Sequence, residues 1–274
     1  MAIKDLLAVV DTGAKDEQFL RDAIAFAEFH GASLGFVVLA DLSAESYGIE
    51  AGITYSFLDD FTRGVEAKQQ RIADLARSAS VNVRTIPDEV AVVFAKTAVY
   101  ARYADLVLFG PAEAYAQPVV RRETIESVLF GTGRPLLVLP HGHVPQPLSH
   151  VALGWNASRE ATRALRDAAW LAEPGAKTDV IVLDGKPSLQ GHGAEPGADI
   201  ARHLSRHGFE AEVVAISAGE RRHSEALLRA AQERGAQMLA LGAYGHSRLR
   251  QMILGGVTRD LLDGSTPMPL LFSH

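Results

Sequence analysis

The sequence contains no cysteine, which excludes disulfide bonds, thiolate metal sites and cysteine nucleophiles. No segment approaches the roughly 18 consecutive apolar residues that a membrane helix requires, and the N-terminus lacks the layout of a signal peptide. The net charge is -6 at pH 7, whereas general nucleic-acid binders usually carry a basic surface. From these absences we expect a cytoplasmic protein whose partners include neither a membrane nor a nucleic acid.

Familiar catalytic and metal-binding motifs are also absent. The sequence has no Walker GxxxxGK[ST], GxSxG, HExxH or EF-hand pattern. His141, His143 and His150 could suggest a metal site, but they lie in or beside a proline-rich segment without matching carboxylates. Solvated histidines are the simpler interpretation. We therefore predict no catalytic residue and no metal ligand.

What the sequence does contain is a regular alternation of strand-like and helix-like segments. The 274 residues, 47% of them hydrophobic, suffice for two cores. Short apolar runs of the kind found in strands buried on both faces occupy 6–10, 36–40, 106–109, 136–139, 151–153, 180–183, 213–216, 238–241 and 270–272. Helical patterns between them cover 16–29, 58–78, 89–103, 159–172, 200–207 and 220–234. Such alternation predicts right-handed βαβ units.

The two halves of the chain also repeat each other. The pattern LRDAxxxAE begins at Leu20 and again at Leu165, an offset of 145 residues. Near the end of each half, RPLLV from Arg134 parallels MPLLF from Met268. Prolines between residues 140 and 147 prevent a helix or a central strand from continuing there. We predict two tandem three-layer α/β domains, residues 1–143 and 149–274, each with a five-stranded parallel sheet.

One glycine-rich segment has the chemistry of a phosphate site. It has the spacing G-x2-G-x9-G and lies between the strand at 238–241 and the start of a helix, which is where ligands bind in open α/β sheets. Glycines allow close backbone approach, and free N–H groups at a helix start favour an anion. Basic side chains in the loop could add charge toward a phosphate. The residues of this predicted site are Gly242, Gly245, His246, Arg248, Gly255, Gly256, Val257 and Thr258.

With these motifs the chain resembles the tandem universal stress proteins (the UspA family) over essentially its full length. The family pattern is the same glycine spacing after the fourth strand, with an acidic residue at the end of the first strand. The resemblance implies a fold like that of the adenine nucleotide α hydrolases, and a loop that holds the phosphates of ATP or AMP. By position, Asn156 would help to hold the nucleoside and Val182 would contact the base. The resemblance further implies that the two domains contact each other through their last strands, so that the chain imitates the dimer of the family. It also implies that the whole chain forms a homodimer.

The second half departs from the family pattern at two positions. Gly256 stands where the family usually has a hydroxyl residue on the terminal phosphate, and Asn156 stands where an Asp would accept ribose hydroxyl hydrogens. Losing one hydroxyl contact to a charged phosphate costs about 1–3 kcal/mol. The amide oxygen of Asn can still accept a hydrogen bond, but it carries no charge. These departures predict weaker binding of a triphosphate.

The first half departs further. Gly110 ends the matching strand, but Pro111 removes a backbone donor and Glu113 replaces the second glycine with a carboxylate that would repel phosphate. The segment 131–133 lies too late in the chain and is typical of a helix C-terminal stop. Asp11 remains, without a phosphate loop beside it. We predict that the first domain is structural.

Two charged runs have simpler interpretations. Arg121-Arg122-Glu123 is typical of a solvated helix start or loop. Asp59-Asp60 precedes a predicted helix and suits its positive N-terminal dipole, so a catalytic pair of carboxylates is not indicated.

Three functions remain open at this point. The first is a stress-response protein that binds an adenine nucleotide in its second domain as a sensing or regulatory ligand. The second is a nucleotide-independent interaction module that contacts an unidentified protein partner and in which the loop is a relic. The third is a slow ATPase, for which the sequence offers no evident general base near the loop.

Overall fold

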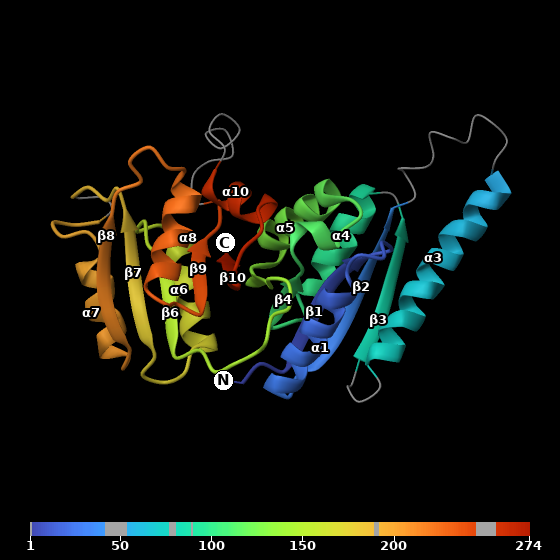
Figure 1. The fold of residues 1–274 in the computed structure, drawn as a ribbon, viewed down its shortest axis with the longest axis horizontal. Helices are drawn as coiled ribbons and strands as arrows, with labels where there is room; N and C mark the ends of the chain where they lie inside the picture. Colours follow the sequence, from blue (N-terminus) through green and yellow to red (C-terminus); the bar gives the residue numbers. More distant parts are fainter. Residues whose placement is uncertain (1, 42–53, 77–80, 89, 189–191, 245–255) are drawn as a thin grey trace. The chain divides into compact units, whose positions relative to one another are not determined.

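The computed structural model describes residues 2–41, 54–76, 81–88, 90–188, 192–244 and 256–274 (Figure 1). The chain divides into two compact units, Met1–Pro145 and Gln146–His274. Within the described ranges, no helix has both the length and the apolar character needed to cross a membrane.

The first unit is built on a five-stranded parallel sheet in the order β3-β2-β1-β4-β5. Its strands are β1 (Asp5–Asp11), β2 (Ser33–Asp41), β3 (Val81–Asp88), β4 (Leu106–Phe109) and β5 (Leu136–Val138). Its helices are α1 (Glu17–His30), α3 (Thr54–Leu75), α4 (Val90–Ala101), the short 3-10 helix η2 (Ala112–Ala114) and α5 (Pro118–Thr132). Helix α1 contacts α3, and α4 contacts α5, beside which it lies in Figure 1. Because right-handed crossovers run outward from β1 to β3 and then back toward β5, these two pairs cover opposite faces of the sheet.

The second unit repeats this topology, with the strand order β8-β7-β6-β9-β10 and parallel pairing throughout. Its strands are β6 (His150–Gly154), β7 (Lys177–Leu183), β8 (Glu210–Ile216), β9 (Met238–Gly242) and β10 (Leu270–Ser273). Its helices are α6 (Arg159–Leu171), α7 (Ala198–Arg206), α8 (His223–Glu233) and α10 (Val257–Asp263). In Figure 1, α7 runs beside β8, with which it is in contact. Each unit is therefore a three-layer α/β fold, which confirms the predicted fold class.

The cores lie where the apolar runs predicted them. Strands β4 and β5 are buried along their whole length, and β1 is buried from Leu6 onward. In the second unit β9 is buried from Met238 to Leu241, and all of β10 is buried. These central strands lack an exposed face, since helices cover both sides of a parallel sheet.

Some elements differ from the sequence-based assignment. Strand β3 was not located, because its sequence contains charged residues and Pro87; proline is tolerated at the outer strand of a sheet, where β3 lies. Helix α5 was not assigned either, although its end confirms the predicted stop: Gly133 follows Thr132 with a φ of 65°. Helix α3 begins at Thr54, so Asp59 and Asp60 lie inside the helix rather than before it.

Candidate functional site

The structure describes part of the predicted phosphate and nucleoside site. Gly245, His246, Arg248 and Gly255 lie outside the described residues. The other predicted residues belong to the second unit and lie near the carboxyl ends of its strands or at the start of α10; they are Asn156, Val182, Gly242, Gly256, Val257 and Thr258.

Asn156 lies in the turn that joins β6 to α6. Its side-chain oxygen accepts the N–H of Ser158 at 3.1 Å, and the hydroxyl of Ser158 in turn caps α6 by accepting the N–H of Ala161 at 3.1 Å. The residue is exposed. The turn thus holds Asn156 in a fixed place while its side chain stays accessible to a ligand at the carboxyl edge.

Gly242 ends β9, and the packing of β9 against α6 requires a glycine at this position, whether or not a phosphate binds there. A Cβ at this position would lie 2.4 Å from the backbone nitrogen of Ala161 and 2.6 Å from the carbonyl carbon of Glu160. Only glycine lets the end of β9 approach the first turn of α6 so closely. The first glycine of the motif therefore joins the loop after β9 to the helix that follows Asn156.

Backbone strain gathers at this carboxyl edge. Among the described residues, the non-glycine residues with positive φ are Ala157 at 58°, Asp184 at 48° and Tyr244 at 56°. They follow the ends of β6, β7 and β9, respectively. A left-handed conformation costs a residue with a Cβ about 1–2 kcal/mol, and such strain tends to cluster at ligand-binding and catalytic sites. The coincidence of three strained residues marks this edge as the candidate functional site.

Asp184 is a member of this edge that the sequence analysis did not single out. Its carboxylate accepts the hydroxyl of Ser217 at 2.7 Å and the N–H of Ala218 at 3.3 Å, which joins the turn after β7 to the turn after β8. These hydrogen bonds lower the pKa of Asp184 below its usual value. The ring of His223, the first residue of α8, lies 3.6 Å from the same carboxylate. An acidic residue directly after a buried strand was the available signal.

The remaining described members of the predicted site differ in accessibility. Val182 lies in β7 and is 1% exposed, backbone and side chain together. Gly256 is the N-cap of α10 and supplies no side-chain cap, and Thr258 is buried. The hydroxyl of Ser224 donates to Asp260 at 3.2 Å, which ties α8 to α10.

In the first unit, by contrast, side chains of the chain itself occupy the equivalent edge. The carboxylate of Asp11 accepts the N–H of Gly13 at 2.8 Å and the N–H of Ala116 at 2.7 Å. The buried hydroxyl of Tyr115 donates to the carbonyl of Val9 at 2.5 Å and accepts the N–H of Gly110 at 3.1 Å. Both oxygens of Asp11 are thus engaged by the loops that follow β1 and β4, whereas the equivalent Asn156 engages one N–H within its own turn.

Arg121 contributes to the same closure, and its interpretation as a solvated residue was wrong. It is 1% exposed, and its guanidinium donates to the carbonyl of Gly110 through Nε at 3.0 Å and Nη2 at 2.8 Å. The guanidinium also lies 5.4 Å from the centre of the Tyr115 ring. A carbonyl that ends a buried strand needs a donor, and Arg121 supplies it.

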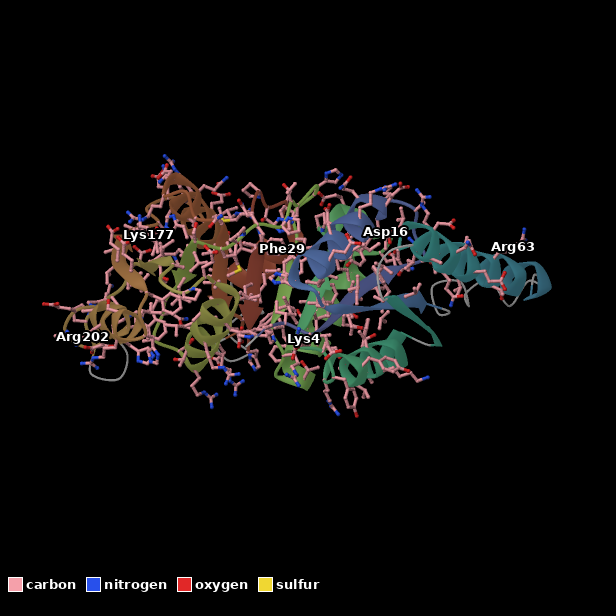
Figure 2. All side chains as sticks on the ribbon, turned by 90° about the horizontal axis from the view of Figure 1, so that it is seen from below. Lys4, Asp16, Phe29, Arg63, Lys177 and Arg202 are labelled. Atoms are coloured by element: carbon pink, nitrogen blue, oxygen red, sulfur yellow. The ribbon has the colours of Figure 1, made fainter. Side chains whose placement is uncertain are left out.

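A buried ion pair completes this edge of the first unit. Lys68 on α3 pairs with Asp16, the N-cap of α1 (Asp16 is labelled in Figure 2), and also donates to the carbonyl of Gly13. Burial raises the pKa of Asp16, an effect that the Lys68 hydrogen bond only partly offsets. The second carboxylate oxygen of Asp16 is buried without a hydrogen-bond partner. This ion pair connects α3 to the N-terminal end of α1.

The comparisons with known proteins agree with this fold. Residues 148–271 match the model of the Universal stress protein family. A universal stress protein of Synechocystis sp. is 25% identical over 150 residues, which are 54% of this chain and 49% of that protein. The chain therefore spans about half the length of the curated relative that it matches.

Two solved structures are similar over nearly the whole chain. A universal stress protein from Archaeoglobus fulgidus has a TM-score of 0.68 at 17% identity, covering 97% of this chain and 95% of its own. A candidate universal stress protein from Pseudomonas aeruginosa has a TM-score of 0.54 at 15% identity, covering 99% and 93%. At these identities the structures support the fold alone. The protein is thus an α/β protein of two tandem domains. Its second unit matches the universal stress protein family over residues 148–271, and the fold of the whole chain is similar to that of solved universal stress proteins.

Proposed function

We propose that the chain is a stress-response protein that binds an adenine nucleotide, ATP or AMP, at the carboxyl edge of its second unit as a sensing or regulatory ligand. The cluster of strained residues Ala157, Asp184 and Tyr244 at that edge is the observation that carries the proposal. The exposed side chain of Asn156 lies in the same turn as Ala157 and supports the placement of a nucleoside there. A cytoplasmic location, a homodimer and an unidentified protein partner belong to the same proposal.

The asymmetry between the units supports a single nucleotide site. Asp11, Tyr115 and Arg121 engage the backbone groups at the edge of the first unit. A ligand there would have to displace buried hydrogen bonds, each of which leaves an unsatisfied group costing about 1–3 kcal/mol. We therefore expect a stoichiometry of one nucleotide per chain.

Calorimetric titration of the full chain with ATP, ADP and AMP tests the proposal. Asn156→Ala removes the side chain proposed to hold the nucleoside, and Gly245→Glu places a carboxylate in the proposed phosphate loop. We expect both to weaken binding by about tenfold or more, an effect of about 1.4 kcal/mol. Asp199→Ala is the matched control, because Asp199 lies on the exposed surface of α7 and its pairing with Arg202 is solvent-exposed.

Wild-type protein that gives no heat with any of the three nucleotides would contradict the proposal and favour the nucleotide-independent interaction module. Binding at two sites per chain would contradict the proposed closure of the first unit. Release of inorganic phosphate from bound ATP would point instead to the slow ATPase, and its absence would exclude that activity.

A further inference from the structure

A hollow of about 400 Å³ opens in the first unit at the amino ends of β1 and β2, beside the C-terminal end of α4. Asp5 and Ser33, the first residues of the two strands, contribute its polar lining, and Gly35 lies between them and the core. The remaining lining is apolar or aromatic and consists of Leu6, Leu7, Phe36, Tyr100, Tyr103 and Ala104. The nucleotide is proposed to bind at the carboxyl ends of strands in the second unit, whereas the hollow lies at the amino ends of strands in the first. The hollow is therefore a separate feature.

In the second unit, charged side chains stand at the positions equivalent to the lining of the hollow. The strand registers align Asp5 with His150 and Gly35 with Asp179, since Asp5 pairs with Ser33 as His150 pairs with Lys177. In the second unit Asp179 is fully buried, and it lies 2.7 Å from His150 Nε2 and 2.7 Å from the Nε of Arg234. These three side chains form an ion cluster at the equivalent strand positions.

The first unit has lost each of those three side chains from this place. Glycine stands at position 35, and a carboxylate stands at position 5. Arg102, which by position matches Arg234, donates its Nε–H to the carbonyl of Gly131 at 3.2 Å, beyond the end of α4. At the hollow, the first unit therefore lacks the ion cluster that the second unit has at the equivalent positions.

Asp5 is the charged residue in the lining of the hollow. The carboxylate of Asp105 accepts the N–H groups of Lys4 and Asp5 at 2.9 and 3.1 Å, which fixes the first residues of β1 beside it. Within the described part of the chain, the side-chain carboxylate of Asp5 takes no ion-pair partner. Tyr103 is 80% exposed, an unusual position for an aromatic ring.

We propose that this hollow binds a small organic cation with an aromatic or apolar body, whose charged group faces Asp5 and whose body lies against Phe36, Tyr100 and Tyr103. The volume lies within the range of small-molecule sites. A cation over the face of a tyrosine gains a further electrostatic attraction. The proposal does not depend on nucleotide binding, because the hollow lies in the first unit, whereas the nucleotide is proposed to bind in the second, and the two sites rest on different residues.

Calorimetry with three probes of the same shape tests the charge requirement. The full chain is titrated at pH 7 with 2-phenylethylammonium, with neutral 2-phenylethanol and with phenylacetate. We expect the ammonium to bind at least about tenfold more tightly than the alcohol, and phenylacetate to give no heat. Equal binding of all three probes, or no heat from the ammonium, would overturn the proposal.

Variants locate the binding on the molecule. Asp5→Asn removes the charge, and Tyr103→Ala removes an exposed ring; we expect each to weaken the ammonium by about tenfold or more. Tyr103 is so exposed that its replacement leaves the fold intact, which circular dichroism verifies. Gly35→Leu fills the hollow and should abolish binding. Glu220→Gln, an exposed residue of the second unit, is the matched charge control and should leave binding unchanged. Unchanged affinity in both Asp5→Asn and Tyr103→Ala would refute the assignment even if the ammonium binds.

Discussion

Arg234 and Asp179 form a two-point ion pair across the start of the second sheet. The Nε of Arg234 lies 2.7 Å from one oxygen of the Asp179 carboxylate, and Nη2 donates to the other at 2.9 Å. His150 lies 2.7 Å from the same carboxylate, so a fully buried charge on β7 is held from β6 and from the end of α8. A buried carboxylate is tolerated only when such partners surround it.

Asp179→Asn should therefore destabilise the second unit substantially. The substitution removes the carboxylate charge that Arg234 and His150 face and leaves Arg234 paired with Glu212 alone. Breaking a buried pair by removing one partner costs about 3–5 kcal/mol. Urea unfolding followed by tryptophan fluorescence measures the loss, since Trp155 and Trp170 both lie in the second unit. Asp199→Asn breaks the exposed pair with Arg202, a residue labelled on α7 in Figure 2, and should cost less than about 1 kcal/mol. Equal losses in the two variants would show that burial is not what makes the Asp179 pair important.

The same carboxylate should make the second unit sensitive to acid. Burial alone would raise the pKa of Asp179, but the hydrogen bonds from Arg234 and His150 outweigh it and hold the pKa below its usual value. Because the folded pKa is depressed, the stabilisation is complete above the unfolded pKa of about 3.9 and is lost as pH falls through the lower folded pKa. The difference in unfolding free energy between wild type and Asp179→Asn should shrink below about pH 4. A difference that stays constant from pH 6 to pH 3 would contradict this assignment.

Asp167 on α6 should change the stability of the second unit with pH in the opposite direction to Asp179. Burial raises its pKa, and the hydroxyl of Ser273, which donates at 2.8 Å, only partly offsets that effect. A raised folded pKa means that the folded state loses stability as pH rises from the unfolded pKa through the folded one. Asp167→Asn keeps an acceptor for Ser273 and removes the charge, so its stability relative to wild type should increase as pH rises above the unfolded pKa of about 3.9. A relative stability that falls over that range would refute the assignment.

The closure of the first unit depends on a single phenol. Tyr115→Phe keeps the buried ring but removes the hydroxyl that joins Val9 to Gly110, which should cost about 1–3 kcal/mol because two buried backbone groups lose their partner. Hydrogen exchange of β1 and β4 reports the effect locally. Tyr103→Phe, on a ring that is 80% exposed, is the matched control and should change nothing measurable. Unaltered exchange in Tyr115→Phe would contradict the role of this hydroxyl.

The arrangement of the strands could be predicted from the sequence, but many of the contacts could not. Apolar runs located β1, β4 and β9, and the repeat gave the division into halves, because burial on both faces leaves a continuous hydrophobic signal. Strand β3 escaped because an outer strand tolerates Pro87 and charged residues. Periodicity reports which face of an element is apolar and carries no information on how polar side chains pair across the fold.

Arg121 and Asp179 illustrate this second limit. Both are charged residues, which the sequence alone would place at the surface, and both are buried. Their burial is possible because each has polar partners from other elements: the carbonyl of Gly110 for Arg121, and His150 and Arg234 for Asp179. Gly35 and Asp179 show that the repeat itself could have given a signal. Equivalent positions with opposite chemistry mark the place where the two units differ.

The strain at Ala157 provides a direct test of the candidate site. Its φ of 58° puts the backbone in the left-handed region. Glycine adopts this conformation without a steric penalty, whereas a β-branched residue pays the largest one. Ala157→Gly should therefore change the stability of the second unit by less than about 1 kcal/mol, because relief of strain offsets the added freedom of the unfolded chain. Ala157→Val should destabilise it by about 1–2 kcal/mol. Urea unfolding monitored by tryptophan fluorescence measures both changes, with Ala243→Gly as a control at a buried residue of the same edge without positive φ.

If the strain also serves ligand binding, Ala157→Gly should weaken nucleotide binding while leaving stability nearly unchanged, since the turn that holds Asn156 is then no longer fixed. Equal stability of the glycine and valine variants would show that the turn relaxes freely and that no strain is held there.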